Sequence, residues 1–423
     1  MTEEYYSTTL PNGLRLLTQP MPSTRSVAVS IYVGAGSRYE RPQEAGLSHL
    51  VEHLLFKGTK RRPTSRHISE IIDGVGGVLN AGTDKELTVY YGKVARPHLE
   101  LVVDVLLDML RHSLFEEEEL EKERRVILEE LASIADSPPQ LVDVLIDSVL
   151  WPGQPLGRDI AGSRESVSAL NREMVLDYVG RQYVPNNIVI SFAGSVTHEE
   201  ALALIEQHTG DWPRGATTGW FPAVGRQERA QVGLIYKRTE QAHISLAFRG
   251  LPIEHPERHT LDLLSAILGE GMSSRLFLEL REHLGLCYDV HCYPSHFLDT
   301  GALDVYAGVE PGNAVKTLTA LMAELRRVRE DVGEEELTRA KEMSKGRILL
   351  RMEDTRAVSG WNGAQELLLG RVWSVDEVLE KVEAVKLDDL LRLANRLLVD
   401  KALNLAIVGP FRSERRFLPL LTL

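Results

Sequence analysis

The sequence predicts an α+β fold made of two tandem homologous domains, each a mostly antiparallel sheet covered by helices. Strand-like and helix-like segments follow one order before residue 213 and repeat that order after residue 230. The stretch between them is rich in Pro and Gly and has no hydrophobic period. With 423 residues, the chain is long enough for two or three domains with substantial cores. We therefore expect domains at 1–212 and 231–423, joined by a linker at 213–230.

Turn residues and hydrophobic periodicity define the elements of the first domain. Asn12-Gly13 predicts a hairpin turn. Ser26–Val33 alternates as a strand does, and Glu44–Gly58 carries the apolar stripe of a helix. Thr64 or Ser65 is placed to cap the next helix. The other expected elements are a helix at 64–75, strands at 76–83 and 86–94, helices near 98–113, 116–135, 140–150 and 168–181, a strand at 187–194 and a helix at 198–208.

The second half repeats this plan. Its helix at 257–269 takes the position of the helix at 44–58, but it carries no comparable His and Glu pattern. The other expected elements are strands at 232–237 and 244–248, a helix at 273–284, strands at 287–297 and 301–309, helices near 312–330, 333–353, 355–369 and 374–397, and a closing strand at 403–409.

Composition narrows the classes of function. The net charge is −13 and no basic stripe compensates for it, which argues against a nucleic-acid partner. The two cysteines, Cys287 and Cys292, exclude a disulfide framework and fit a reducing cytoplasm. The N-terminal residues lack the basic start and apolar run of a signal peptide, and no apolar stretch approaches a membrane span. We expect a cytoplasmic protein without a membrane partner.

The helix expected at 44–58 carries a polar stripe suited to a divalent metal. At about 100° per residue, His49 and His53 share one face, and Glu52 lies beside them. Apolar residues fill the opposite side. Two imidazoles at i and i+4 can reach one zinc ion, and the order H-x-x-E-H leaves the Glu free to act on the metal-bound water.

A later helix offers a third ligand. Glu123 and Glu130 are seven residues apart and therefore share a helix face, whereas Glu129 points about 100° away. The acidic run at 116–119 lies near the start of that helix, where negative charge interacts favourably with the helix dipole.

The pattern His49-Leu-Val-Glu52-His53, followed 77 residues after His53 by Glu130, resembles the inverzincin peptidases. This family includes pitrilysin, insulin-degrading enzyme and the mitochondrial processing peptidase, and the chain resembles a short two-domain member of bacterial type. The resemblance implies that His49, His53 and Glu130 bind one Zn²⁺ per chain. It also implies that Glu52 activates a zinc-bound water as general base, and that Glu123 is a carboxylate that supports the ligands.

The resemblance assigns roles outside the metal motif as well. It implies that Arg281 and Tyr288, seven residues apart in the second domain, bind the backbone of a peptide substrate. It further implies that Asn80, Ala81 and Thr83 belong to an edge strand that pairs with the extended substrate.

The expected function is a zinc-dependent endopeptidase acting on unfolded peptides or presequence-like segments. Large members of the family use four such domains, so a two-domain chain is expected to form a homodimer, with the second domain of one chain facing the zinc of the other. Two alternatives remain. The chain could be a non-catalytic structural subunit, like the core subunits of the respiratory bc1 complex, or a zinc hydrolase of a non-peptide substrate.

Overall fold

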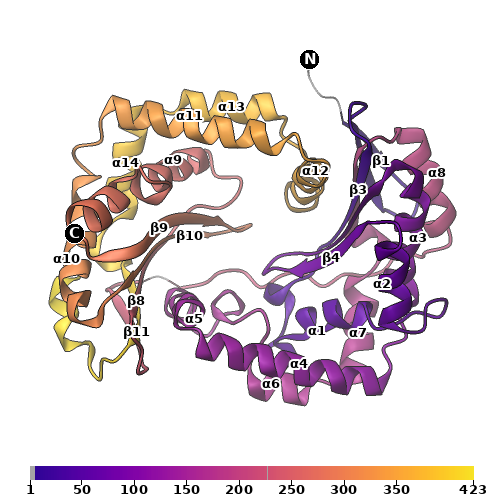
Figure 1. The fold of residues 1–423 in the computed structure, drawn as a ribbon, viewed down its shortest axis with the longest axis horizontal. Coiled ribbons are helices and arrows are strands. Elements are labelled where there is room, and N and C mark those ends of the chain that lie inside the picture. Colours follow the sequence, from indigo (N-terminus) through magenta and orange to yellow (C-terminus); the bar gives the residue numbers. More distant parts are fainter. Residues whose placement is uncertain (1–4, 226) are drawn as a thin grey trace. The chain divides into compact units, whose positions relative to one another are not determined.

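The computed structural model describes residues 5–225 and 227–423. Two compact units make up the chain, and Figure 1 shows their elements. The first unit comprises Met1–Leu131, Asp159–Phe221 and Leu349–Ser374. The second comprises Ala132–Arg158, Pro222–Ile348 and Val375–Leu423. Residues 1–4 of the N-terminal segment and residue 226 of the predicted linker lie outside the described residues.

A six-stranded sheet is the centre of the first unit as described. The strand order is β1-β2-β6-β3-β5-β4, and all neighbours are antiparallel except β2 and β6, which are parallel. In the described part of the chain, β4 pairs with β5 alone and therefore forms an edge. The strands are β1 (Tyr6–Thr9), β2 (Arg15–Pro20), β3 (Ser26–Val33), β4 (Val78–Thr83), β5 (Thr88–Ala95) and β6 (Ile188–Gly194).

Helices cover both faces of this sheet. Val29 and Ile31 of β3 point into the large core that holds α1 and α3. Tyr32 follows Ile31 in the strand, so its side chain points to the opposite face, where it packs against α12. The helices of this unit are α1 (Leu47–Leu55), α2 (Ser65–Asp73), α3 (Leu99–His112), α4 (Glu117–Asp136), α6 (Arg164–Ala169), α7 (Arg172–Gln182), α8 (His198–Thr209) and α12 (Thr355–Leu369).

The sheet of the second unit has the same plan. Its order, β7-β11-β8-β10-β9, matches β2-β6-β3-β5-β4 strand for strand, including the single parallel pair. The predicted fold class, two homologous α+β domains, is therefore confirmed. The strands are β7 (Gln231–Tyr236), β8 (Ala242–Arg249), β9 (Cys287–His296), β10 (Gly301–Val309) and β11 (Asn404–Gly409).

Helices of the second unit repeat the plan too, with α9 following β8 as α1 follows β3. The region expected as a helix at 273–284 contains a π-helical segment, Phe277–His283. The other helices of this unit are α5 (Pro138–Leu150), α9 (Arg258–Gly269), α10 (Ala314–Arg327), α11 (Glu334–Arg351), α13 (Val375–Ala384) and α14 (Leu387–Leu397).

Each unit takes one helix from the other half of the sequence. In the first unit, α12 packs so closely on the sheet that a Cβ added at Gly363 would lie 2.5 Å from the ring of Tyr32. In the second unit, α5 covers the sheet, and a Cβ at Gly233 would lie 2.6 Å from Val149. The chain passes between the units at several points, and one of them, from Phe221 to Pro222, falls inside the segment expected as a linker.

Two expected helices have different bounds in the structure. The helix expected at 44–58 is α1, which spans only Leu47–Leu55. The single helix expected at 374–397 is two helices, α13 and α14. Lys386 leaves helical geometry with ψ of 159°, and its backbone N–H donates to the carboxylate of Asp389 at 3.0 Å, which caps a new helix. Thr64, one of the two expected caps, does cap α2.

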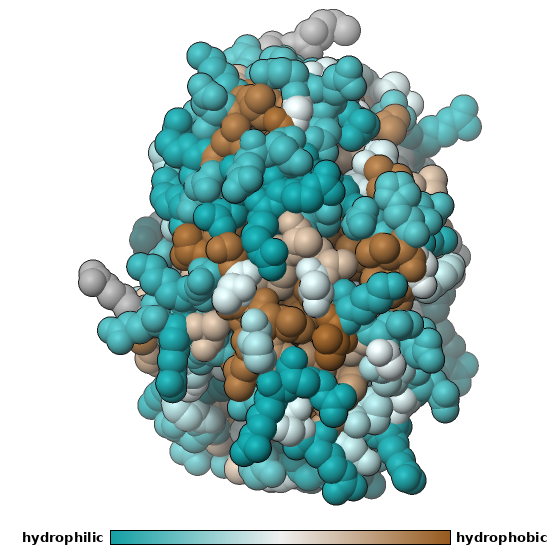
Figure 2. Space-filling model, turned by 90° about the vertical axis from the view of Figure 1, so that its left-hand side faces the viewer, coloured by the Kyte–Doolittle hydropathy of each residue, from teal (hydrophilic) through white to brown (hydrophobic). Residues whose placement is uncertain are grey.

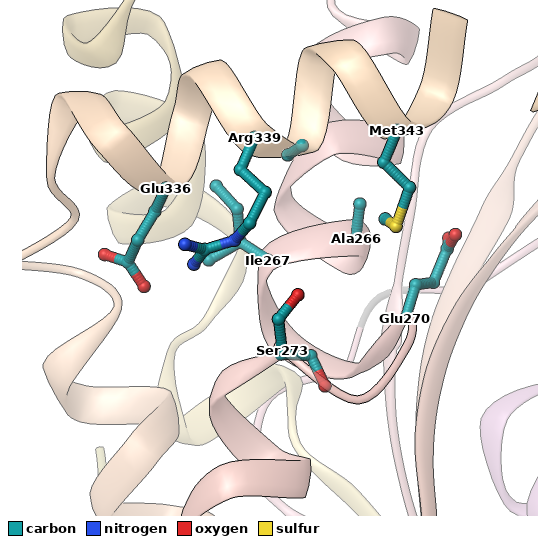
Figure 3. Close-up of a pocket in the computed structure, with 9 residues that line it drawn as sticks. Ala266, Ile267, Glu270, Ser273, Glu336, Arg339 and Met343 are labelled. Atoms are coloured by element: carbon teal, nitrogen blue, oxygen red, sulfur yellow. The ribbon is translucent and has the colours of Figure 1, made fainter. Parts of the chain in front are cut away.

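The surface is mostly polar. Figure 2 shows one face, on which hydrophilic residues surround a central group of apolar ones. A small pocket in the second unit, about 10 Å³, has room for about one water molecule. Figure 3 shows Ala266 and Ile267 of α9 and Arg339 and Met343 of α11 around it. Among the described helices, none is long and apolar enough to cross a membrane.

Candidate metal centre

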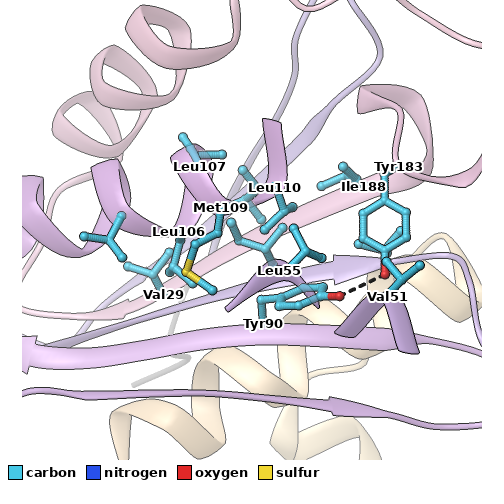
Figure 4. Packing of buried hydrophobic residues seen from close by; sticks show 14 of the residues in the cluster. Val29, Val51, Leu55, Tyr90, Leu106, Leu107, Met109, Leu110, Tyr183 and Ile188 are labelled. Atoms are coloured by element: carbon cyan, nitrogen blue, oxygen red, sulfur yellow. Dashed lines mark hydrogen bonds between the residues drawn. The ribbon is translucent and has the colours of Figure 1, made fainter. Parts of the chain in front are cut away.

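The apolar side of α1 fixes this helix in the first core. Leu50, Val51, Leu54 and Leu55 are each at most 1% exposed. Figure 4 shows Val51 and Leu55 packed among side chains of β3, β5 and α3. Burying one such side chain stabilises the fold by about 1.5–3 kcal/mol. The helix therefore has one strongly preferred rotation about its axis, and the polar residues between these positions stay outside the core.

The start of α1 is set by Gly46 and Glu40. Gly46 has a φ of 92°, a left-handed conformation that favours glycine, and a Cβ there would lie 2.5 Å from the carbonyl oxygen of Ala161. The Glu40 carboxylate accepts the backbone N–H of Gly46 at 2.9 Å and of Ser48 at 2.6 Å. A carboxylate at this end stabilises the helix dipole. These contacts explain why the helix begins at Leu47 and not at residue 44.

His49, His53 and Glu130 converge, as the sequence predicted. One ligand atom from each lies within 4.8 Å of the others. The carboxylate oxygen Oε2 of Glu130, on α4, lies 3.9 Å from Nε2 of His49 and 3.9 Å from Nε2 of His53. Among residues 5–225 and 227–423, no other His, Cys, Asp and Glu residues form such a group. Two imidazole nitrogens and a carboxylate oxygen are donors that zinc prefers, so the residues fit this ion.

Glu123 holds the ring of His53. Its Oε2 lies 3.0 Å from Nδ1 of His53, and its Oε1 accepts from Nζ of Lys57 at 2.7 Å. Because a carboxylate only accepts hydrogen bonds, Nδ1 carries a proton, and in the neutral form of the ring Nε2 has its lone pair available for a metal. Glu123 is 5% exposed, so this contact is shielded from water.

His49 is neutral in this environment. Burial, and in addition the charge of His53, lower the pKa of His49 to about 4. Neutral imidazole is the form that binds a metal. Nδ1 of His49 is buried without a hydrogen-bond partner in the described structure. The rings of His49 and His53 meet edge to face, with centroids 4.5 Å apart.

Glu52 contacts the edge strand β4. Oγ1 of Thr83 donates to Oε2 of Glu52 at 2.6 Å. Burial raises the pKa of Glu52, while the bond from Thr83 and the charge of His53 act in the opposite direction. The carboxylate is therefore held in one orientation, and its pKa lies above that of an exposed glutamate.

Asn80, Ala81 and Thr83, expected to form a substrate-binding strand, lie together on β4. Neighbouring residues of a strand point to opposite faces. Thr83 and Ala81 point toward α1, and Ala81 packs against the core. Asn80 points to the other face, and its Oδ1 accepts the backbone N–H of Ala81 at 2.8 Å. Their binding of a substrate stays a prediction.

Arg281 and Tyr288 form a pair in the second unit. Arg281 belongs to the π-helical segment, and its Nη1 donates to the backbone carbonyl of Tyr288 at 3.2 Å. Its guanidinium also lies 4.7 Å from the centroid of the Tyr288 ring. Tyr288 is 77% exposed and so is open to a ligand. The structure brings these two residues together, and their role in substrate binding stays a prediction.

Lys57 is a member of the site that the sequence analysis missed. It follows His53 by four residues, the spacing of one helix face in the helix expected at 44–58, although α1 itself ends at Leu55. That spacing was a usable signal. The bond from Thr83 to Glu52 could not be found in this way, because it depends on how β4 is placed against α1.

Comparisons with known proteins place the chain in a family. Residues 15–164 match the insulinase family, peptidase family M16, and residues 169–344 match a family described as peptidase M16 inactive domain. An uncharacterized zinc protease of Bacillus subtilis is 36% identical over 404 residues, which are 95% of this chain and 97% of that protein. An uncharacterized zinc protease of Streptomyces coelicolor is 37% identical over 415 residues, 96% of this chain and 90% of that protein.

Solved structures share the fold. A protease from Helicobacter pylori superposes with a TM-score of 0.91 at 23% identity, over 96% of this chain and all of that chain (100%). A chain of complex III from Candida albicans gives a TM-score of 0.84 at 21% identity, over 99% of this chain and 100% of that chain. At these identities the likeness concerns the fold alone.

Proposed function

The chain belongs to the insulinase family, peptidase family M16, and from this premise we propose that it is a zinc-dependent endopeptidase of unfolded peptides or presequence-like segments. The observation that carries the proposal is the convergence of His49, His53 and Glu130. Glu52 lies close enough to His53 and Glu130 for their charges to act on its pKa. Two imidazoles and one carboxylate as ligands, with a nearby glutamate that does not bind the ion, are the parts of a hydrolytic zinc site.

The residues divide the chemistry among them. His49, His53 and Glu130 hold the ion, which supplies Lewis acidity toward water and toward the peptide carbonyl. Glu52 accepts the proton of the attacking water and delivers it to the leaving amine. Its raised pKa suits both tasks, because one group must act first as base and then as acid. Thr83 orients the carboxylate, and Glu123 orients the ring of His53.

The substrate binds as an added strand. The free edge of β4, with Asn80 and Ala81, offers backbone groups to an extended peptide. Binding through the backbone gives loose sequence selectivity and favours unfolded chains. Arg281 and Tyr288 contribute donors for the peptide backbone, and the phenol of Tyr288 supports the developing oxyanion.

The active form is a homodimer in this proposal. The second unit of one chain faces the zinc of its partner, so that the partner's copy of the Arg281 and Tyr288 pair completes the site. Closed two-fold dimers are the commonest soluble oligomers. The compartment is the cytoplasm, which fits the two free thiols, Cys287 and Cys292.

A second candidate is a non-catalytic structural subunit. The fold it shares with a chain of complex III favours it, as does the name of the family that matches residues 169–344. The complete set of His49, Glu52, His53 and Glu130 opposes it, because a scaffold needs none of these groups to converge.

Metal content, measured together with cleavage of an unfolded peptide, distinguishes an endopeptidase from a structural subunit. The endopeptidase binds zinc and cuts the peptide, and substitution of Glu52 removes cleavage alone. A structural subunit cuts nothing, with or without zinc.

A further inference from the structure

The first unit has a larger pocket, which lies between the sheet and the start of α12. Its volume is about 280 Å³, slightly below the roughly 300–1,000 Å³ of small-molecule pockets. We call it the arginine pocket. It is lined by Ser30 and Tyr32 of β3, by Val89 and Tyr91 of β5, and by Arg351, Asp354, Arg356, Ala357 and Gly360.

The pocket has an excess of positive charge. Its carboxylate, Asp354, is already engaged: Oδ2 accepts from Nζ of Lys93 at 2.6 Å, and Oδ1 accepts the backbone N–H groups of Arg356 and Ala357 at the start of α12. Within the described residues, neither Arg351 nor Arg356 has a carboxylate partner. The guanidinium of Arg356 instead lies 3.8 Å from the centroid of the Tyr91 ring. Both arginines are exposed residues, so their guanidiniums can be reached by a ligand from solvent.

Tyr32 points to a ligand independently. Its side chain is only 8% exposed and lines the pocket, yet its hydroxyl has no hydrogen-bond partner among the described residues. Burial raises the pKa of Tyr32 to about 12, although Arg356 and Arg351 act to lower it. The hydroxyl therefore stays protonated and is available as a donor. The hydroxyl is not among the buried polar atoms that lack a partner, so it reaches solvent in the pocket, where a ligand oxygen can replace water as its acceptor.

The pocket lies on the face of the sheet that a peptide on β4 would meet. In the register of β4 and β5, Tyr91 stands opposite Asn80 and Val89 stands opposite Gly82. An added strand places every second side chain on this face. Neighbouring strands lie about 4.8 Å apart, and β4 lies between such a peptide and β5, so the peptide lies two strand spacings from β5. An acidic side chain of the peptide and the side chain of Arg356, which lies over Tyr91 of β5, can together span that distance. Gly82 leaves the way open, with no atom within 4 Å of where its Cβ would be.

We propose that the arginine pocket is a subsite for a carboxylate of the peptide substrate, supplied by an acidic side chain or by the C-terminus. Arg351 and Arg356 contribute forked donors that match a carboxylate, and Tyr32 contributes its hydroxyl. The inference rests on the proposed peptidase function and adds a preference for negatively charged substrates to it.

The test is binding of labelled, unstructured peptides to the Glu52→Gln chain, followed by fluorescence anisotropy. Peptide pairs differ only in one Glu against Gln, or only in a free against an amidated C-terminus, so the two sources of the carboxylate are separated. The peptide with the preferred carboxylate is expected to bind about tenfold more tightly. The preference should disappear in the double variant Arg351→Gln/Arg356→Gln and weaken in Tyr32→Phe. It should persist in Arg66→Gln, which changes an exposed arginine of α2.

Equal binding of all four peptides, or a preference that survives the double variant, overturns the inference. The first of these results needs no pocket variant, so a folding defect in the double variant does not obscure it. Cleavage by the wild-type chain separates the two levels of the proposal. If unfolded peptides are cut but the carboxylate has no effect on binding, only the pocket assignment fails. If no peptide is bound or cut, the peptidase proposal fails and the subsite fails with it.

Discussion

The hydroxyl of Thr83 donates a hydrogen bond of 2.6 Å to the carboxylate of Glu52. This bond links the end of the edge strand β4 to the middle of α1. The residue proposed to activate water is thus held by the strand proposed to bind the substrate. Because the two elements are coupled, the position of the peptide and the orientation of the base are set together.

Thr83→Val should lower kcat by about tenfold, because the shape is kept while the bond that orients Glu52 is lost. Zinc content and KM should change little. Thr83→Ser keeps a hydroxyl and is the matched control, with activity near that of the wild type. Steady-state cleavage of a quenched fluorescent peptide measures both parameters. Equal kcat in the valine and serine variants would mean that the bond has no part in catalysis.

Glu123→Ala should weaken zinc binding by about 10- to 100-fold, the usual effect of removing a partner that orients a ligand. The ring of His53 loses its acceptor at Nδ1, and Lys57 loses its ion pair. Competition with a metal chelator of known affinity measures the change. Glu129→Ala is the control, because Glu129 lies on the same helix and is exposed. Unchanged zinc affinity in Glu123→Ala would contradict the account of this carboxylate.

The shared site of the proposed homodimer predicts complementation between two inactive variants. Glu52→Gln damages the zinc half, and Arg281→Ala damages the half that binds the peptide backbone. In a mixed dimer with sites shared across chains, one of the two sites is intact, so the purified mixed dimer should regain about half of wild-type activity. Two differently tagged variants, expressed together and purified through both tags, provide the sample. Absence of any recovery would show that each chain forms its own site.

The acid stability of the second unit should depend on Asp262. Its carboxylate lies 2.9 Å from Nε2 of His296 and 3.3 Å from Nδ1 of His259. Burial acts to raise the pKa of Asp262, but the hydrogen bonds from these histidines hold it well below its ordinary value of 3.8. The folded state therefore binds fewer protons than the unfolded chain, so the stabilisation is complete above about pH 4 and is lost as the pH falls further.

Asp262→Asn should lower stability at pH 7 by about 1 kcal/mol and flatten its decline between about pH 4 and pH 2. Urea unfolding followed by circular dichroism across this pH range measures both effects. Asp136→Asn, at an aspartate whose side chain is 87% exposed, is the control. A decline as steep in Asp262→Asn as in the wild type would assign the acid sensitivity to other groups.

Much of the fold could be read from local pattern. β3 occupies Ser26–Val33 as expected, because alternating side chains on a strand with two covered faces leave little freedom in its bounds. The start of α1 was harder to predict, because it depends on Glu40 and Gly46, which lie outside the apolar stripe. The break at Lys386 is set by one capping carboxylate, which the hydrophobic period does not reveal.

The exchange of α5 and α12 could not be predicted in the same way. Hydrophobic period shows that a helix has an apolar face, but not which sheet covers it. The same limit hid the arginine pocket, where Arg356 meets Tyr91 across 265 residues of sequence. His49, His53 and Glu52 could be predicted from the sequence because they share one short helix. Glu130 could be predicted because its spacing from Glu123 matches two helical turns.

Glu52→Gln tests the central claim most directly, because Glu52 is proposed to act on water without binding the metal. Zinc content and cleavage of a quenched fluorescent peptide are measured on the same preparations of wild type and variant. We predict one zinc ion per chain in both proteins and a loss of cleavage in the variant by at least about a hundredfold. A wild-type chain that binds no zinc, or a variant that keeps both zinc and full cleavage, would contradict the proposed site.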